Sequence, residues 1–304
     1  MKQIELKAYA KINLSIDVLR RRSDGYHDVC IIMQLVNLFD EIKVGFKKGK
    51  KAIEISLSTD MEDLPVDSSN LAYRAAELII NKYYQDKGGI IDIHIAKKIP
   101  PAAGLAGGSA DGAAVLHALN ILLDLRLSLD ELKELGMKLG ADVPFCVMGQ
   151  AAISKKFSKD RTSTCALAEG IGEILTPIKP LESWVVLSKP PVNISTKDIY
   201  QSLNVSEIQE RPDTLSLIDG LKEENFKKIT NSMFNVLEEV SESKYPEIQK
   251  TKEIMKGVIG DYKVMMTGSG PTVFAISSDY RTAEIIFNEI REYNKDTFLV
   301  TTLI

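Results

Sequence analysis

The amino-acid sequence predicts an α+β protein in two lobes. With 304 residues, the chain is long for one hydrophobic core, so two domains are expected. Apolar and polar residues alternate through its start, as they do in β-strands. The second half mixes helical segments with a few short strands. Together these observations indicate the α+β class.

Strands come first along the chain. Residues 4–18 alternate cleanly between apolar and polar side chains. Because this run is longer than a typical strand, we expect a bend or two strands end to end. A turn follows at residues 20–25, where Asp24-Gly25 is a common turn pair. Three further strands are expected near residues 29–37, 41–46 and 52–58.

Three helices and one strand are predicted in the middle of the chain. Asp67-Ser68-Ser69 introduces the first helix, and Gly88-Gly89 stops it. The third helix starts with a capping box formed by Ser128 and Glu131 and ends at Gly140. The helices are expected near residues 70–85, 109–123 and 128–139, and the strand at residues 91–95.

The second half is predicted to contain shorter elements of both kinds. Helices are expected near residues 196–203, 214–220, 223–240, 246–256 and 280–293. Strands are expected near residues 183–188, 262–267, 272–277 and 297–303. The turn Gly268-Ser-Gly-Pro271 joins the second and third of these strands.

The most informative segment is the glycine-rich run at residues 100–114. Glycine lets a backbone turn tightly and approach a ligand without a Cβ in the way. At the start of the following helix, unpaired N–H groups and the positive end of the helix dipole favour an anion. We interpret the run as a phosphate-binding loop. The alternative is a plain strand-to-helix connector with Ser109 as N-cap.

This run differs from two common phosphate-binding motifs. It is not a Walker A loop, because no Gly-Lys-Ser/Thr closes it. It is not a Rossmann fingerprint either, because Ala106 stands where the second glycine of that motif belongs.

Composition and charge exclude several classes of protein. A net charge of −4 argues against binding nucleic acid by neutralising its phosphates. No apolar run approaches membrane-spanning length, and the start shows no signal-peptide core. The three cysteines (Cys30, Cys146 and Cys165) lack metal-binding spacing and suit a reducing compartment. We therefore expect a cytoplasmic protein, and the composition is compatible with a soluble enzyme.

Other candidate residues also have plain structural explanations. Lys11 and Asn13 are two apart on one predicted strand and so point the same way, although a lone lysine on a strand usually faces solvent. Asp142 follows a helix, and it also suits an N-cap for a segment that opens with Pro144. The turn at residues 268–270 is either a plain hairpin or a second backbone surface near the phosphates.

Over nearly its whole length, the order of motifs in the chain resembles the GHMP small-molecule kinases. The glycine loop and the last turn are shared by that superfamily. The other three motifs are typical of the branch that acts on a cytidine-diphosphate-linked methylerythritol. In chain order the motifs are Ala10-Lys-Ile-Asn-Leu14, Asp24-Gly-Tyr-His27, the loop from Pro101 to Ala114, Leu139-Gly-Ala-Asp-Val-Pro-Phe145 and Met266-Thr-Gly-Ser-Gly-Pro271.

The resemblance implies a two-lobed GHMP kinase fold. Residues 1–158 would form the N-terminal ATP-binding domain, with a ribosomal-protein-S5-domain-2-like lobe. Residues 159–304 would form the C-terminal domain, with a ferredoxin-like α+β lobe.

The resemblance also implies an ATP-dependent kinase whose acceptor is the 2-hydroxyl of the methylerythritol group. Asp142 would take the proton of that hydroxyl, and Lys11 would keep the carboxylate ionised and stabilise charge on the acceptor side. Mg²⁺ would arrive with ATP, with Ser109 as one ligand and the other ligands unidentified. The ATP-binding residues would be Pro100, Pro101, Ala102, Ala103, Gly104, Leu105, Ala106, Gly107, Gly108, Ser109 and Ala110.

For the second substrate, the resemblance implies a site for cytosine. Tyr26 and Tyr200 would sandwich the base, and His27 would recognise its polar edge. Asn13 and Thr196 would orient the methylerythritol group. Without the resemblance, Tyr26 and His27 end a hairpin turn, and Tyr200 is a helix residue that packs on the core.

The chain departs from the family's pattern at two places. Ala110 stands where many relatives have a second Ser or Thr, and residues 153–166 form a longer polar segment, predicted to be an inserted hairpin or flap without an assigned function.

Two alternative functions stay open. A homoserine or mevalonate kinase would lack Asp24-Gly-Tyr-His27, and a non-catalytic nucleotide-binding protein would have no use for both Lys11 and Asp142.

Overall fold

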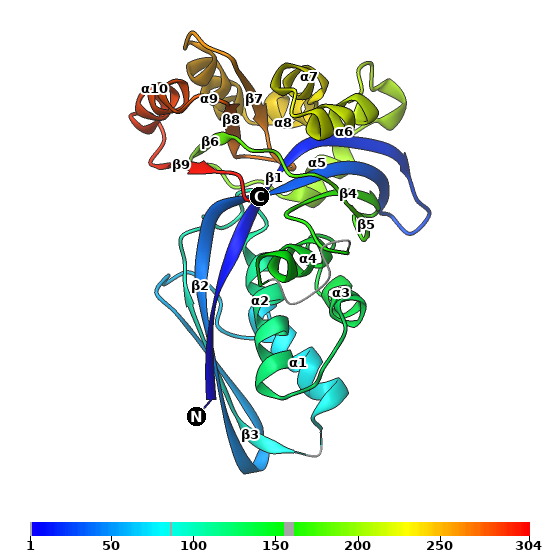
Figure 1. Cartoon of the computed structure of the whole chain (residues 1–304), viewed down its shortest axis with the longest axis vertical. Coiled ribbons are helices and arrows are strands. Elements are labelled where there is room, and N and C mark those ends of the chain that lie inside the picture. Colours follow the sequence, from blue (N-terminus) through cyan, green and yellow to red (C-terminus); the bar gives the residue numbers. More distant parts are fainter. Residues whose placement is uncertain (1, 86, 155–160) are drawn as a thin grey trace. The chain divides into compact units, whose positions relative to one another are not determined.

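The computed structural model describes residues 2–85, 87–154 and 161–304, and the chain forms two compact units. Strands and helices occur in both units, which confirms the α+β class (Figure 1). Neither unit is one continuous stretch of chain. The first contains residues 1–10, 39–99 and 106–162, and the second contains residues 11–38, 100–105 and 163–304.

Two long strands begin the chain, and both contribute to both units. Strand β1 (Lys2–Arg21) is one continuous strand of 20 residues, so of the two expected alternatives, a bend or two strands end to end, the second is wrong. The stretch labelled β2 (His27–Thr59) covers 33 residues and reverses direction near Gly49, because residues 41–49 and residues 52–59 both pair along residues 88–96, in opposite directions. It therefore merges the strands expected near residues 29–37 and 41–46, whereas the strand expected near residues 52–58 is separate, as predicted. No glycine or proline interrupts residues 27–44, so nothing in that stretch breaks the strand.

In the first unit, strand β3 (Gly88–Ala96) pairs antiparallel with β2 from Glu41↔Ala96 to Gly49↔Gly88, and it also pairs with residues 52–59. Four helices gather on one side of these strands (Figure 1). Every residue from 110 to 119 is buried in the second of them, as expected for a helix whose apolar residues are not confined to one face. The helices are α1 (Leu71–Tyr83), α2 (Gly107–Leu122), α3 (Leu129–Met137) and α4 (Val143–Ser154).

The second unit contains a four-stranded antiparallel sheet in the order β7-β8-β6-β9. This is the strand order of the predicted ferredoxin-like lobe, and helices α9 and α10 pack against it. The elements are β6 (Trp184–Lys189), α9 (Pro246–Lys256), β7 (Tyr262–Met266), β8 (Val273–Ser277), α10 (Tyr280–Arg291) and β9 (Asp296–Thr301).

A second group of strands in this unit was not predicted. Strand β4 (Cys165–Gly170) pairs with β2 along residues 29–34 and with β5 (Ile174–Pro177). The polar segment predicted as a hairpin or flap at residues 153–166 overlaps the end of α4 and the start of β4. Its residues 155–160 lie outside the described part of the chain.

One expected helix is interrupted in the structure. Instead of a single helix over residues 223–240, two helices are separated by an extended segment that pairs with β1. The Ile16 N–H donates to Phe234 O at 2.9 Å, and the Val236 N–H donates to Ile16 O at 3.1 Å. The other helices of this unit are α5 (Thr196–Ser202), the 3₁₀ helix η2 (Val205–Glu207), α6 (Thr214–Glu223), α7 (Phe226–Ser232) and α8 (Glu238–Lys244).

Candidate active site

The second half of the glycine loop runs directly into helix α2. The helix begins at Gly107, after Ala106 in the left-handed region with φ 57°, and no described side chain caps it. The alternative that placed Ser109 at the N-cap is therefore wrong, because Ser109 lies inside the first turn. With no side-chain cap, the backbone N–H groups of that turn and the helix dipole are available to an anion.

The first half of the loop packs on the turn at residues 267–270 within the second unit. Gly104 has a φ of +73°, and a Cβ there would lie 2.8 Å from Thr267 O and 2.9 Å from Gly270 O. The Lys11 N–H donates to Leu105 O at 3.1 Å. The turn is therefore more than a plain hairpin, because it supports the loop.

The other two glycines of the loop differ in the space that the protein leaves around them. A Cβ on Gly107 would lie 2.9 Å from Ile99 Cγ2 and 3.3 Å from Lys97 Nζ, so the protein itself leaves no room there. A Cβ on Gly108 would meet only Leu71 Cδ1, at 3.7 Å, which is an ordinary contact. A need for glycine at position 108 would therefore come from a ligand.

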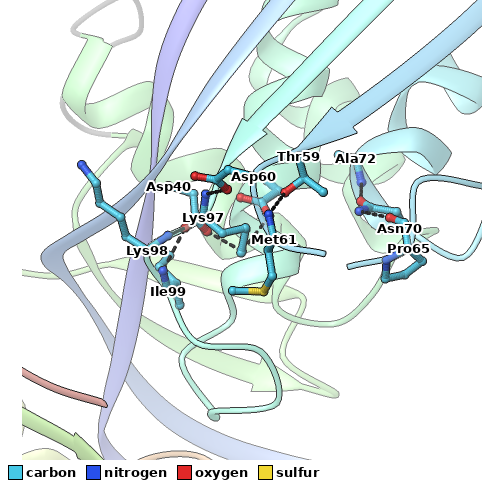
Figure 2. A network of polar contacts seen from close by, with 11 residues as sticks. Asp40, Thr59, Asp60, Met61, Pro65, Asn70, Ala72, Lys97, Lys98 and Ile99 are labelled. Atoms are coloured by element: carbon cyan, nitrogen blue, oxygen red, sulfur yellow. Dashed lines mark hydrogen bonds and ion pairs between the residues drawn. The ribbon is translucent and has the colours of Figure 1, made fainter. Parts of the chain in front are cut away.

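A buried charge network in the first unit joins Lys97 to Asp40 and to Asp111 of helix α2, and Figure 2 shows Lys97 next to Asp40. The ammonium group of Lys97 pairs with Asp40 at 2.5 Å and with Asp111 at 3.0 Å, and the three side chains are at most 3% exposed. Asp40 also accepts hydrogen bonds from the N–H groups of Lys98 at 2.6 Å and Ile99 at 2.9 Å. These contacts hold residues 97–99, which directly precede the glycine loop, in place.

The environment of this network perturbs two of its groups. Burial raises the pKa of Asp111 to about 7, and the negative charge of Asp40 adds to the rise while Lys97 opposes it. For Lys97, burial acts to lower the pKa, but the two carboxylates outweigh it and the pKa is raised. Asp111 Oδ1 has no hydrogen-bond partner within the described residues. Sequence reasoning missed this network, since its members share no local pattern.

Lys11 and Asn13 are brought together in the second unit. Their side chains are buried (4% and 1% of each residue exposed), so the alternative of a solvent-facing lysine is wrong. Lys11 Nζ donates to Asn13 Oδ1 at 2.8 Å, and Asn13 Oδ1 also accepts from the Thr267 hydroxyl at 3.1 Å. Thr267 belongs to the motif Met266-Thr-Gly-Ser-Gly-Pro271, but its position in that motif indicates no separate role for its side chain.

Asp142 belongs to the first unit and directly precedes α4. Its backbone carbonyl accepts the Cys146 N–H at 3.2 Å, which is the first hydrogen bond of that helix, and its side chain is half-buried. The structural explanation of Asp142 as a helix-start residue is thus correct for its backbone, and Pro144 lies in the first turn as expected.

The residues predicted to contact cytosine lie in the second unit. The Tyr26 N–H donates to Asp24 Oδ1 at 3.1 Å in the turn at Gly25, and Tyr26 is 59% exposed. His27 is buried and lies against Tyr200, with ring centroids 5.4 Å apart. Burial, followed by the positive charge of Arg21, lowers the pKa of His27, so the neutral ring is favoured.

Thr196 lies at the start of α5, where its hydroxyl is 2.9 Å from the Ser269 hydroxyl. Thr196 is exposed, so its side chain is accessible to a ligand next to the turn at residues 267–270.

The described residues contain no helix that is long and apolar enough to cross a membrane. They also contain no group of three or more His, Cys, Asp or Glu side chains that would hold a metal ion.

The chain matches two family models, described as "GHMP kinases N terminal domain" over residues 70–150 and "GHMP kinases C terminal" over residues 217–296. Two curated relatives are named 4-diphosphocytidyl-2-C-methyl-D-erythritol kinase. The one from Alkaliphilus metalliredigens is 45% identical over 99% of this chain and 97% of its own length. The one from Clostridioides difficile is 44% identical over 98% of this chain and 95% of its own length.

Two solved structures share the fold. A 4-(cytidine 5'-diphospho)-2C-methyl-D-erythritol kinase has a TM-score of 0.76 and 27% identity, with 98% of this chain and 99% of that chain covered. A homoserine kinase from Cytophaga hutchinsonii has a TM-score of 0.70 and 20% identity, with 100% and 95% covered. The second likeness concerns the fold alone. The predicted GHMP kinase fold is confirmed.

Proposed function

Because the chain belongs to the 4-diphosphocytidyl-2-C-methyl-D-erythritol kinase family of the GHMP kinases, we propose that it phosphorylates the 2-hydroxyl of that cytidyl compound with ATP. The observation that carries this proposal is 45% identity to such a kinase over 99% of the chain. The reaction belongs to the non-mevalonate pathway to isoprenoid precursors.

The phosphates of ATP bind over the glycine loop, residues 100–110. Three features support this placement: the start of α2 has no described side-chain cap, Gly104 approaches the turn at residues 267–270 closely, and a Cβ fits the protein at Gly108. Mg²⁺, when bound, neutralises charge on the phosphates. It commonly takes one or two protein ligands and keeps the rest as water and phosphate, and Ser109 in the first turn of α2 is the side chain that would hold it.

Asp142 and Lys11 act on the acceptor hydroxyl. Asp142 accepts the proton, or orients the hydroxyl if the transition state is loose. The ammonium group of Lys11 stabilises negative charge on the acceptor side, and its burial strengthens that effect because little water screens it. Asn13 and Thr196 orient the methylerythritol group.

Tyr26, His27 and Tyr200 recognise cytosine. The ring contact between His27 and Tyr200 supports placing these two side chains on one site, and the exposed Tyr26 has a ring face free for a base. A neutral imidazole has one donor and one acceptor nitrogen, which suits the polar edge of cytosine. Edge hydrogen bonds of this kind distinguish cytosine from uracil, whereas stacking does not.

Two further predictions, of the domain boundary and of the cellular location, accompany this assignment. The predicted domain boundary at residues 158 and 159 falls between the two matched family ranges and stays a prediction. The cysteines form no disulfide bond among the described residues, which supports the proposed cytoplasmic location because disulfides are rare in a reducing compartment.

A substrate panel tests the proposal. Turnover of ATP should be measured with 4-diphosphocytidyl-2-C-methyl-D-erythritol, homoserine and mevalonate, each at several concentrations. We expect kcat/KM to be highest by far with the cytidyl compound, and CDP to compete with it. Phosphorylation of homoserine or mevalonate alone would contradict the proposal and leave a different GHMP kinase.

A further inference from the structure

Thr267 and Asn13 close a ring of two hydrogen bonds inside the second unit. The Asn13 backbone N–H donates to Thr267 Oγ1 at 3.0 Å, and the Thr267 hydroxyl donates to Asn13 Oδ1 at 3.1 Å. A hydroxyl has a single proton. Because the oxygen of this hydroxyl already accepts the backbone N–H, its proton is directed to the side-chain oxygen of Asn13.

This ring determines which way the Asn13 carboxamide points. An amide side chain can turn over and exchange its oxygen for its NH₂ group. The donated hydrogen bond from Thr267 requires an oxygen at that position, and the same oxygen accepts Lys11 Nζ at 2.8 Å. The turned-over amide would place NH₂ hydrogens against both the hydroxyl proton and the ammonium group.

Thr267 is itself held from the other side by helix α8 and the segment before it. The Asn235 side-chain NH₂ donates to Met266 O and to Gly268 O, both at 2.9 Å. Glu238 accepts the Met266 N–H at 2.7 Å, and the Ser241 hydroxyl donates to Ser269 O at 3.1 Å. The carbonyls and amide on both sides of Thr267 are therefore fixed.

We propose that Thr267 is a positioning residue for phosphoryl transfer: its hydroxyl fixes the Asn13 carboxamide, which in turn holds the ammonium group of Lys11 in place. The inference rests on the proposed function, in which Lys11 stabilises charge on the acceptor side. Thr267 touches Asn13 and does not itself need to touch ATP or the acceptor.

Thr267→Val tests the proposal because valine keeps the shape and removes the hydroxyl. The variant removes both hydrogen bonds of the ring, and loss of the one that positions the Asn13 carboxamide should lower kcat about tenfold, which corresponds to about 1.4 kcal/mol. KM for ATP should stay the same, because valine keeps the Thr267 carbonyl that faces Gly104 of the glycine loop and changes only the side chain that faces Asn13. Thr267→Ser, which restores the hydroxyl, should recover most of kcat. If Thr267→Val does not fold, Thr267→Ala carries the same test.

Thr272→Val is the matched control. Thr272 lies in the same hairpin and is fully buried like Thr267 (both 0% exposed), but its hydroxyl has no hydrogen-bond partner among the residues described. Removing an unpaired buried hydroxyl is close to neutral for a fold. This variant should therefore retain the wild-type kcat and both KM values.

Lys11→Met separates failure of the inference from failure of the proposed function. Inactive Lys11→Met together with wild-type kcat in folded Thr267→Val would overturn the positioning role and leave the proposed function intact. Wild-type kcat in both variants would remove the proposed role of Lys11 as well. A loss of activity in Thr267→Val that Thr267→Ser fails to restore would also overturn the inference, since a lost hydroxyl would then not be its cause.

Discussion

Replacing Asp111 with asparagine should remove a pH dependence from the stability of the fold. Burial raises the pKa of Asp111 from its ordinary 3.8 to about 7, with Asp40 adding to the rise and Lys97 opposing it. Between those two values, the folded protein holds a proton that the unfolded chain has released. The free energy of unfolding therefore falls as the pH rises through this range, and the loss is complete above the folded pKa.

The size of the effect follows from the two pKa values. A carboxyl group whose pKa rises from 3.8 to about 7 costs about 4 kcal/mol of stability at high pH. Of this cost, about 2–3 kcal/mol develops between pH 5 and pH 8. Asparagine has nearly the shape of a protonated aspartate and does not titrate, so Asp111→Asn should gain that amount over wild type across the same interval.

Urea denaturation followed by circular dichroism at several pH values between 5 and 8 measures the difference. Asp60→Asn is the matched control, because Asp60 is an exposed carboxylate that accepts the backbone N–H of Lys97 at 2.8 Å. The control should follow the wild-type pH profile. If Asp111→Asn and wild type also gave parallel profiles, Asp111 would be ionised throughout and the account of the buried network would be wrong.

Three further variants test the candidate site. Asp142→Asn should lower kcat at least about a hundredfold, while ATP binding measured by calorimetry stays unchanged. Near-normal turnover would show that Asp142 has only a structural role at the start of α4. Gly108→Ala should leave Tm unchanged, since the added Cβ meets only Leu71 Cδ1, at 3.7 Å, but should weaken ATP binding because the methyl group would lie against the phosphates. An unchanged ATP affinity would show that the phosphates bind elsewhere. Tyr200→Ala should raise KM for the cytidyl substrate about tenfold and leave KM for ATP constant, because stacking on a base contributes about 1–3 kcal/mol; an unchanged KM would remove Tyr200 from the base site.

Local patterns in the sequence predicted most elements because their start and stop signals are short. The capping box of Ser128 and Glu131 is present as predicted, and the C-terminal strands and helices lie within a few residues of their expected places. The helix expected over residues 223–240 was wrong, because residues 234 and 236 pair with Ile16, more than 200 positions earlier. Such pairing overrides helix propensity and leaves no local signal.

The candidate site also combines residues that local motifs reveal with residues that only the folded chain brings together. Lys11, Asn13 and the loop could be found because each lies in a compact motif. The partnership of Asn13 with Thr267 spans 254 positions, and the bonds of Lys97 to Asp40 and Asp111 span 57 and 14. Nothing in a single sequence reports that such residues are neighbours, and nothing in it distinguished a buried Lys11 from a surface lysine.

The most direct test of the proposed reaction is the position of the transferred phosphate. After incubation of the protein with ATP, Mg²⁺ and 4-diphosphocytidyl-2-C-methyl-D-erythritol, proton-coupled ³¹P NMR should show one new phosphomonoester resonance. The carbon at the 2-position carries a methyl group and no hydrogen, so a phosphate on its oxygen gives a singlet. We expect that singlet. A resonance split by carbinol protons would place the phosphate on another hydroxyl, and the absence of any new phosphomonoester would contradict the assignment altogether.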